Sequence, residues 1–147
     1  MRAIFEGKAE KLITGRLEKG DKIPDALLEI CKQHGVKAGW IFAIGAISRI
    51  WVMTYEQRKK SYTDPIEAEG DFEILSLTGN ISLLDDKGFL HLHVVAAELI
   101  GGREKFVVGH LVNAEVFALE FIIFPIAGVA LERALDELTG LKLWKKQ

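Results

Sequence analysis

The order of its strand-like segments is the feature that most constrains how this chain can fold. Segments rich in β-branched and aromatic residues cover 38–55, 72–84, 89–98 and 115–124, and the one clear helical pattern precedes them all. Strands that follow one another favour antiparallel pairing, whereas strands that alternate with helices favour a parallel sheet. The order therefore predicts an α+β fold with a mainly antiparallel sheet and one clear helix.

The helical segment is expected at 21–35. Asp21 suits the N-cap, Pro24 suits the first turn and Gly35 suits the position just after the helix. Its apolar residues recur at helical spacing and should face the core: Ile23, Leu27, Ile30 and Cys31.

Turn signals divide the remaining chain. Asp85–Gly88 should join the strands on either side of it as a hairpin, and Gly101–Arg103 should form another turn. The last strand-like segment is expected to end at Pro125, while 131–144 fits either a helix or a strand.

Length and composition predict a single domain, 1–147, in the cytoplasm. A chain of 147 residues can bury a substantial core, and the lone Cys31 excludes an intramolecular disulfide and fits a reducing compartment. The start of the chain lacks the apolar stretch of a signal peptide. The longest apolar stretch, 117–131, is interrupted by Glu120 and Pro125, so no membrane partner is expected.

Three of the four histidines lie within 20 residues, and they are the candidate functional cluster of the chain. His91 and His93 are two apart on a predicted strand, so their side chains share a face about 6.6 Å apart along the chain. His110 follows Gly109, which lets backbone or ligand approach closely.

These residues alone leave two interpretations open. A His-x-His pair on a strand is often two exposed or hydrogen-bonded side chains. Three imidazoles without a thiolate also resemble a zinc site whose fourth position is open, which is either catalytic or binds a small anionic ligand.

Other activities find little support. The chain has no phosphate-binding loop, no nucleophile elbow and no His-Glu-x-x-His motif. Its net charge is −2, and its short basic run, Arg58–Lys60, fits a solvated turn. The sequence therefore does not support DNA binding by this chain alone, since phosphate neutralisation requires clustered cations.

Several motifs follow one another in order along the chain. They are Gly15–Gly20, Ile44–Ser48, Gly70–Gly79 with its Phe-Glu-Ile-Leu-Ser-Leu string, the His-Leu-His triplet and Gly109–Leu111. Through these motifs the chain resembles the plants-and-prokaryotes-conserved (PPC) domain family over essentially its whole length.

The resemblance implies an antiparallel α+β domain that assembles as a homotrimer. Plant members carry an AT-hook with an Arg-Gly-Arg-Pro core, which this chain lacks, so their DNA-binding role is not transferred. The chain looks like prokaryotic metal-binding members, which implies one zinc-like ion per chain, held by His91, His93 and His110.

Two further residues are candidates around such an ion. Arg16 lies in a family motif, and its guanidinium suits a carboxylate or phosphate. Glu73 alternates with apolar residues and is expected to be partly buried, as a partner for Arg16, an acceptor for an imidazole N–H, or a general base.

Two functions remain as alternatives. The first is a small trimeric metal-binding protein, with metal-assisted chemistry on a small substrate. The second is a non-catalytic regulatory, DNA-associated or protein-interaction module with a structural metal.

Overall fold

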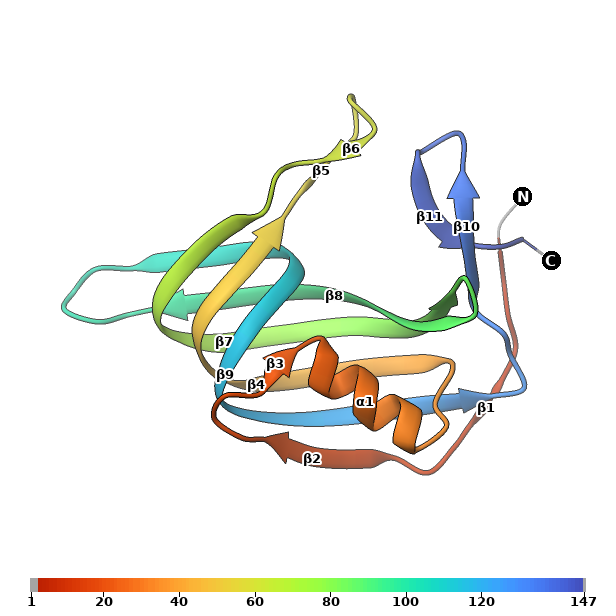
Figure 1. Cartoon of the computed structure of the whole chain (residues 1–147), viewed down its shortest axis with the longest axis horizontal. Coiled ribbons are helices and arrows are strands. Elements are labelled where there is room, and N and C mark those ends of the chain that lie inside the picture. Colours follow the sequence, from red (N-terminus) through yellow and green to blue (C-terminus); the bar gives the residue numbers. More distant parts are fainter. Residues whose placement is uncertain (1–2, 147) are drawn as a thin grey trace.

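A computed structural model describes residues 3–146, and most of its regular secondary structure is β-strand (Figure 1). The elements in chain order are β1 (Lys8–Ala9), β2 (Ile13–Leu17), β3 (Lys22–Ile23), α1 (Asp25–Gln33), β4 (Gly39–Met53), β5 (Tyr55–Glu56), β6 (Ser61–Tyr62), β7 (Ile66–Leu84), β8 (Lys87–Glu98), β9 (Lys105–Ala127), β10 (Glu132–Asp136) and β11 (Leu141–Trp144).

Four long strands pair in a closed ring. β4 pairs with β7 and β9, and β8 also pairs with β7 and β9, in every case antiparallel. Register shifts interrupt the β4–β7, β4–β9 and β7–β8 ladders, and such bulges let long strands bend strongly. β10 adds to β7 in parallel. The predicted α+β class with a mainly antiparallel sheet is confirmed.

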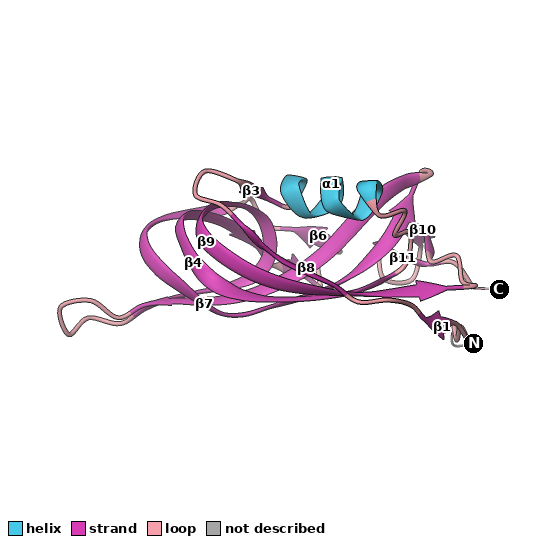
Figure 2. Cartoon of the chain, turned by 90° about the horizontal axis from the view of Figure 1, so that it is seen from below, coloured by secondary structure: helices cyan, strands magenta, loops and turns pink. Residues whose placement is uncertain are grey.

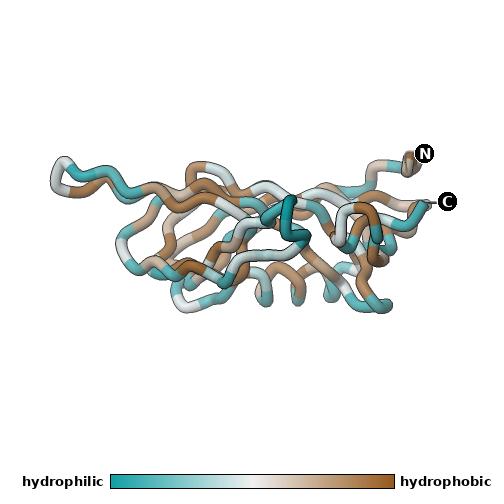
Figure 3. Tube along the Cα trace, turned by 90° about the horizontal axis from the view of Figure 1, so that it is seen from above, coloured by the Kyte–Doolittle hydropathy of each residue, from teal (hydrophilic) through white to brown (hydrophobic). Residues whose placement is uncertain are grey.

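The core lies inside this ring and under α1, which crosses one side of the strands (Figure 2). Leu92, Val94 and Ala96 of β8 face the core, as their alternation predicts, together with Leu27 and Cys31 of the helix. Hydrophobic residues run along the strands in Figure 3. Burial raises the pKa of the Cys31 thiol to about 11, so this side chain is an inert core residue.

The helix begins later in the chain than the sequence predicts. It starts at Asp25 rather than Asp21, because Lys22 and Ile23 pair with β9 as a short strand. Asp21 instead accepts a hydrogen bond from the Glu18 backbone N–H at 2.8 Å. Gly35, with φ of +67°, lies just after the helix as expected. Among the described residues, no helix is long and apolar enough to span a bilayer.

The hairpin between β7 and β8 is confirmed, with Asp85 and Asp86 at its turn, both at positive φ. β9 does not end at Pro125, because the next two residues pair with β1. The segment 131–144 is a hairpin of two strands, β10 and β11. This hairpin and the β5–β6 arm rise from the same side of the ring (Figure 1), joined by a hydrogen bond from the Tyr55 hydroxyl to the Thr139 carbonyl.

The close approach of β7 and β8 requires glycine at position 79. A Cβ built on Gly79 would lie 2.1 Å from the His91 carbonyl oxygen, whereas one on Gly88 of the same hairpin meets only Leu28 at 3.6 Å.

We expect Gly79→Ala to lower the free energy of unfolding by about 2 kcal/mol or more, since the backbones of β7 and β8 must move apart. Gly88→Ala should change it by less than about 0.5 kcal/mol. Urea unfolding of both variants measures this, and equal midpoints would contradict it.

Candidate metal centre

The three clustered histidines come from two neighbouring strands. His91 and His93 lie on β8 and share the face opposite Leu92 and Val94, as predicted. β9 then brings His110 directly opposite His93 in the antiparallel ladder. Side chains directly opposite each other in such a ladder lie on the same face, so all three imidazoles meet outside the ring.

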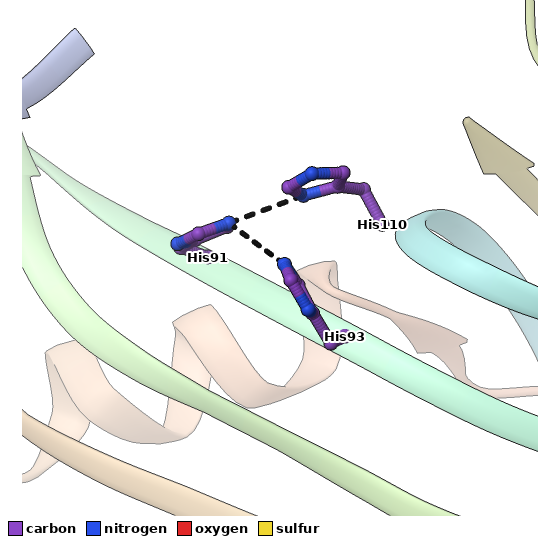
Figure 4. A group of neighbouring side chains, drawn as sticks. All are labelled: His91, His93 and His110. Carbon is purple, nitrogen blue, oxygen red and sulfur yellow. Dashed lines mark hydrogen bonds between the residues drawn. The ribbon is translucent and has the colours of Figure 1, made fainter. Parts of the chain in front are cut away.

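The ring nitrogens of the cluster converge (Figure 4). His91 Nε2 lies 3.1 Å from His110 Nδ1 and 3.2 Å from His93 Nε2. The three ligand atoms all lie within 4.8 Å of one another. A tetrahedral ion with ligands at 2.0–2.1 Å holds its nitrogens about 3.3 Å apart. The observed spacing therefore fits a zinc-like ion with only small side-chain movements.

Hydrogen bonding alone does not explain this arrangement. His91 Nε2 faces two other ring nitrogens, yet a neutral imidazole nitrogen has either one proton or one lone pair. It can therefore satisfy only one neighbour at a time. A cation at the centre would accept the lone pairs of all three, and this is the chemistry that the donor set fits.

Neighbouring residues fix the position of His110. Gly109 has φ of +148°, and a Cβ there would lie 2.9 Å from the Met53 carbonyl oxygen. The missing side chain thus lets the backbone of β4 approach β9 closely. Close approach of backbone is one of the two roles that the sequence predicts for Gly109. On the other side Tyr62 of β6 packs edge-on against the His110 ring, at 5.2 Å between centroids.

The surroundings of His91 and His110 favour their neutral forms. Burial, the largest cause, together with the positive charge of Arg133 and the neighbouring His93 and His110, lowers the pKa of His91 to about 4. Burial also lowers the pKa of His110, with a smaller contribution from His93. Metal ligation requires neutral imidazoles, so these shifts favour binding at neutral pH.

Arg133 is the residue near the cluster that the sequence did not indicate. It lies on β10, in a segment whose pattern fits either a helix or a strand, so nothing in the chain order placed it beside β8. It donates to the Asn80 side chain, and Asn80 is the ladder partner of His91.

The structure does not bring Arg16 and Glu73 to the histidines. Glu73 is exposed rather than partly buried, because its neighbours Phe72 and Ile74 take the core-facing positions. Arg16 pairs with Glu18 instead of Glu73. Both line a separate cleft, and Glu73 lies five residues, roughly 16 Å, along β7 from the partner of His93. The roles predicted for these two residues around the ion, anion binding by Arg16 and hydrogen bonding to an imidazole or proton transfer by Glu73, therefore find no support in their positions.

Fold and cluster together define a small α+β protein with a candidate three-histidine metal centre. The profile of the Plants and Prokaryotes Conserved (PCC) domain matches residues 4–127, and the chain belongs to this family, called PPC above. The curated proteins include no match to the chain.

Solved structures of relatives superimpose on nearly the whole chain. A metal-containing protein of Archaeoglobus fulgidus is 39% identical, with a TM-score of 0.91, over 99% of this chain and 100% of its own. A PPC protein of Pyrococcus horikoshii is 28% identical, with a TM-score of 0.88, over 99% of both chains. A candidate DNA-binding protein of Bacteroides thetaiotaomicron is 26% identical, with a TM-score of 0.80, over 95% and 96%.

The lowered pKa of His91 predicts how the metal-free protein responds to acid. Below about pH 6.5 the unfolded chain binds a proton at this position, whereas the folded chain resists protonation down to about pH 4. Stability should therefore fall as pH falls through this window. We expect His91 to contribute about 1–2 kcal/mol of the loss, after allowance for its partial exposure.

Unfolding free energies in chelator at pH 7 and pH 5 measure this effect. His91→Gln should reduce the loss between the two pH values, whereas His34→Gln, at the exposed end of α1, should not. The same loss in wild type and His91→Gln would show that the folded protein does not resist protonation of His91.

Proposed function

We propose that this protein is a metal-binding PCC-domain protein whose ion, one zinc per chain, is held by His91, His93 and His110. The observation that carries the proposal is the convergence of three ring nitrogens, of which His91 Nε2 can satisfy only one neighbour at a time by a hydrogen bond. The metal-containing relative at 39% identity supports it.

The surroundings of the cluster suit chemistry on a small substrate. Zinc with three protein ligands keeps an open position and can polarise a substrate or lower the pKa of bound water to about 7. A cleft of about 780 Å³ reaches His91, and another of about 700 Å³ reaches His93 and His110. Tyr55 and Lys60 line the second cleft and could orient a polar ligand there.

We also propose that the chain assembles as a closed homotrimer through the outer face of the ring. Trp40, Phe42 and Ile44 alternate along β4 and are exposed, Ile44 at 56%. Phe124 lies opposite Trp40 on β9, and the Phe42 and Phe124 rings pack edge to face at 5.7 Å. A contiguous exposed apolar surface of this kind is typical of a subunit interface.

The interface face and the histidine cluster are continuous. Across the sheet, Trp40 lies opposite Asn80, which lies opposite His91, and Phe42 leads in the same way through Thr78 to His93. Assembly through this face would therefore also shield the candidate metal centre from bulk water.

The alternative is a regulatory, DNA-associated or protein-interaction module with a structural metal. The candidate DNA-binding relative from Bacteroides thetaiotaomicron favours it. Against it, this chain carries a net charge of −2 and no AT-hook core. Its basic run, Arg58–Lys60, lies on the exposed turn between β5 and β6, where no helix is offered to a DNA groove. Metal binding is therefore the function that the site supports best.

Metal content tests the metal proposal directly. Purified wild-type protein should hold about one zinc per chain by elemental analysis, and His91→Ala/His93→Ala should hold close to none, because two of three ligands are removed. The matched control is His34→Ala, since His34 lies outside the cluster. Equal metal content in wild type and the double variant would end the proposal.

Solution mass tests the assembly. Light scattering at micromolar concentration should give about three times the chain mass of 16.4 kDa. Phe42→Glu should shift the mass towards one chain, since it buries a charge in the interface, whereas Phe42→Leu should remain trimeric. A wild-type mass of a single chain would refute the trimer and leave the metal proposal standing.

A further inference from the structure

Arg133 has an unusual environment for a charged side chain. It is only 8% exposed, and it lies across the outer face of the β7–β8 hairpin. Its Nε donates to Ser82 Oγ at 2.8 Å, and its Nη2 donates to Asn80 Oδ1 at 2.7 Å. Its Nη1 donates to the Lys142 carbonyl at 2.8 Å, while Phe89 packs against the guanidinium at 5.1 Å.

All of these acceptors are neutral. The ion pairs among residues 3–146 are Arg16–Glu18, Arg49–Glu67, Lys59–Glu56 and Lys145–Glu132, and none includes Arg133. A buried charge without a counter-ion is costly, so buried arginines are ordinarily paired with an anion. The guanidinium has five N–H donors, of which three are used, so two remain for a further acceptor.

The unpaired charge lies next to the histidine cluster. Asn80, which binds Arg133, is the ladder partner of His91, and the two side chains therefore share a face. Arg133 and His91 line the same cleft of about 780 Å³. Lys145 and Lys146 also line it, against a single acidic residue, Asp136, so the cleft is positively charged overall.

We propose that Arg133 binds the oxyanion group, a carboxylate or phosphate, of a small ligand that occupies this cleft at the metal centre. The proposal rests on the proposed function, because the cleft is lined both by the guanidinium and by His91 of the candidate metal centre. A planar guanidinium is suited to two parallel hydrogen bonds with such an oxyanion. The ligand would supply the counter-ion that residues 3–146 do not.

The position of Arg133 assigns a role to the C-terminal hairpin. The PCC profile ends at residue 127, whereas Arg133 and both cleft lysines lie beyond it. The histidines therefore come from the family domain, and the anion-recognising charge comes from the hairpin that follows it. We infer that this hairpin selects anionic ligands for the centre.

Protein loaded with Co²⁺ allows metal binding and ligand binding to be measured separately. The visible absorption of Co²⁺ reports its coordination, and calorimetry gives the affinity for added glycolate or inorganic phosphate. Arg133→Met keeps the side-chain volume but removes the charge. It should weaken the affinity for whichever of the two anions wild-type protein binds more tightly by about tenfold or more. Lys145→Met is the matched control, because it removes the same charge from the same cleft and should weaken binding by less than about threefold.

Each result separates the two proposals. Tenfold weakening in Arg133→Met alone, with Co²⁺ still bound in equal amount, supports the inference, and the tighter ligand identifies carboxylate or phosphate. Equal affinity in wild type and Arg133→Met overturns it while metal binding stands. Co²⁺ bound equally by His91→Ala/His93→Ala would overturn the proposed function itself.

A second measurement needs no variant, in case Arg133→Met does not fold. Glycolate and glycolamide share the same hydroxyl, but only glycolate carries a charge. Wild-type protein should bind glycolate, or phosphate where that is the tighter anion, at least about tenfold more tightly than glycolamide. Equal binding of the neutral and charged ligands would overturn the inference.

Discussion

Antiparallel pairing of β8 with its two neighbours is the constraint on which the rest of the structure depends. Pairing with β9 places His110 opposite His93, and pairing with β7 places Asn80 opposite His91. A slip of one residue in either ladder would turn these side chains to the opposite face and point the histidines into the core. The candidate centre therefore forms only in the observed register of both ladders. Gly79 helps to maintain that register, because it allows the backbones of β7 and β8 to approach closely.

The candidate metal centre and its neighbour Arg133 favour opposite charges: the histidines suit a cation, and the guanidinium suits an anion. Burial and the positive charge of Arg133 lower the pKa of His91, which leaves its lone pair free for a metal at neutral pH. Arg133 itself is buried without a carboxylate partner among the described residues, and it donates to the neutral side chains of Ser82 and Asn80 on the β7–β8 hairpin. A metal at the histidines and an anionic ligand at the guanidinium would each stabilise the other, because opposite charges attract strongly where water is excluded.

Much of the fold follows from patterns within single segments. Alternation along β8 correctly separates Leu92 and Val94 from His91 and His93, and the paired aspartates locate the turn before it. The helix was predicted four residues too early, because capping signals cannot reveal that Lys22 and Ile23 pair with a strand ninety residues later. Glu73 was placed incorrectly for a related reason, since alternation predicts two faces but does not say that this face of β7 is open.

By itself the sequence determined the class of fold and the family, and it placed His91 and His93 together, because spacing along one strand decides which side chains share a face. Their meeting with His110 depends on the pairing of β8 with β9. The sequence did not determine which charged group lies beside them. Arg133 reaches His91 only because β10 pairs in parallel with the end of β7, a contact between segments about fifty residues apart. Arg16 was the candidate from the sequence, because it lies in a family motif. The structure places it on β2, in another part of the sheet, where it pairs with Glu18. Long-range strand pairing, which local residue patterns do not encode, decided between the two arginines.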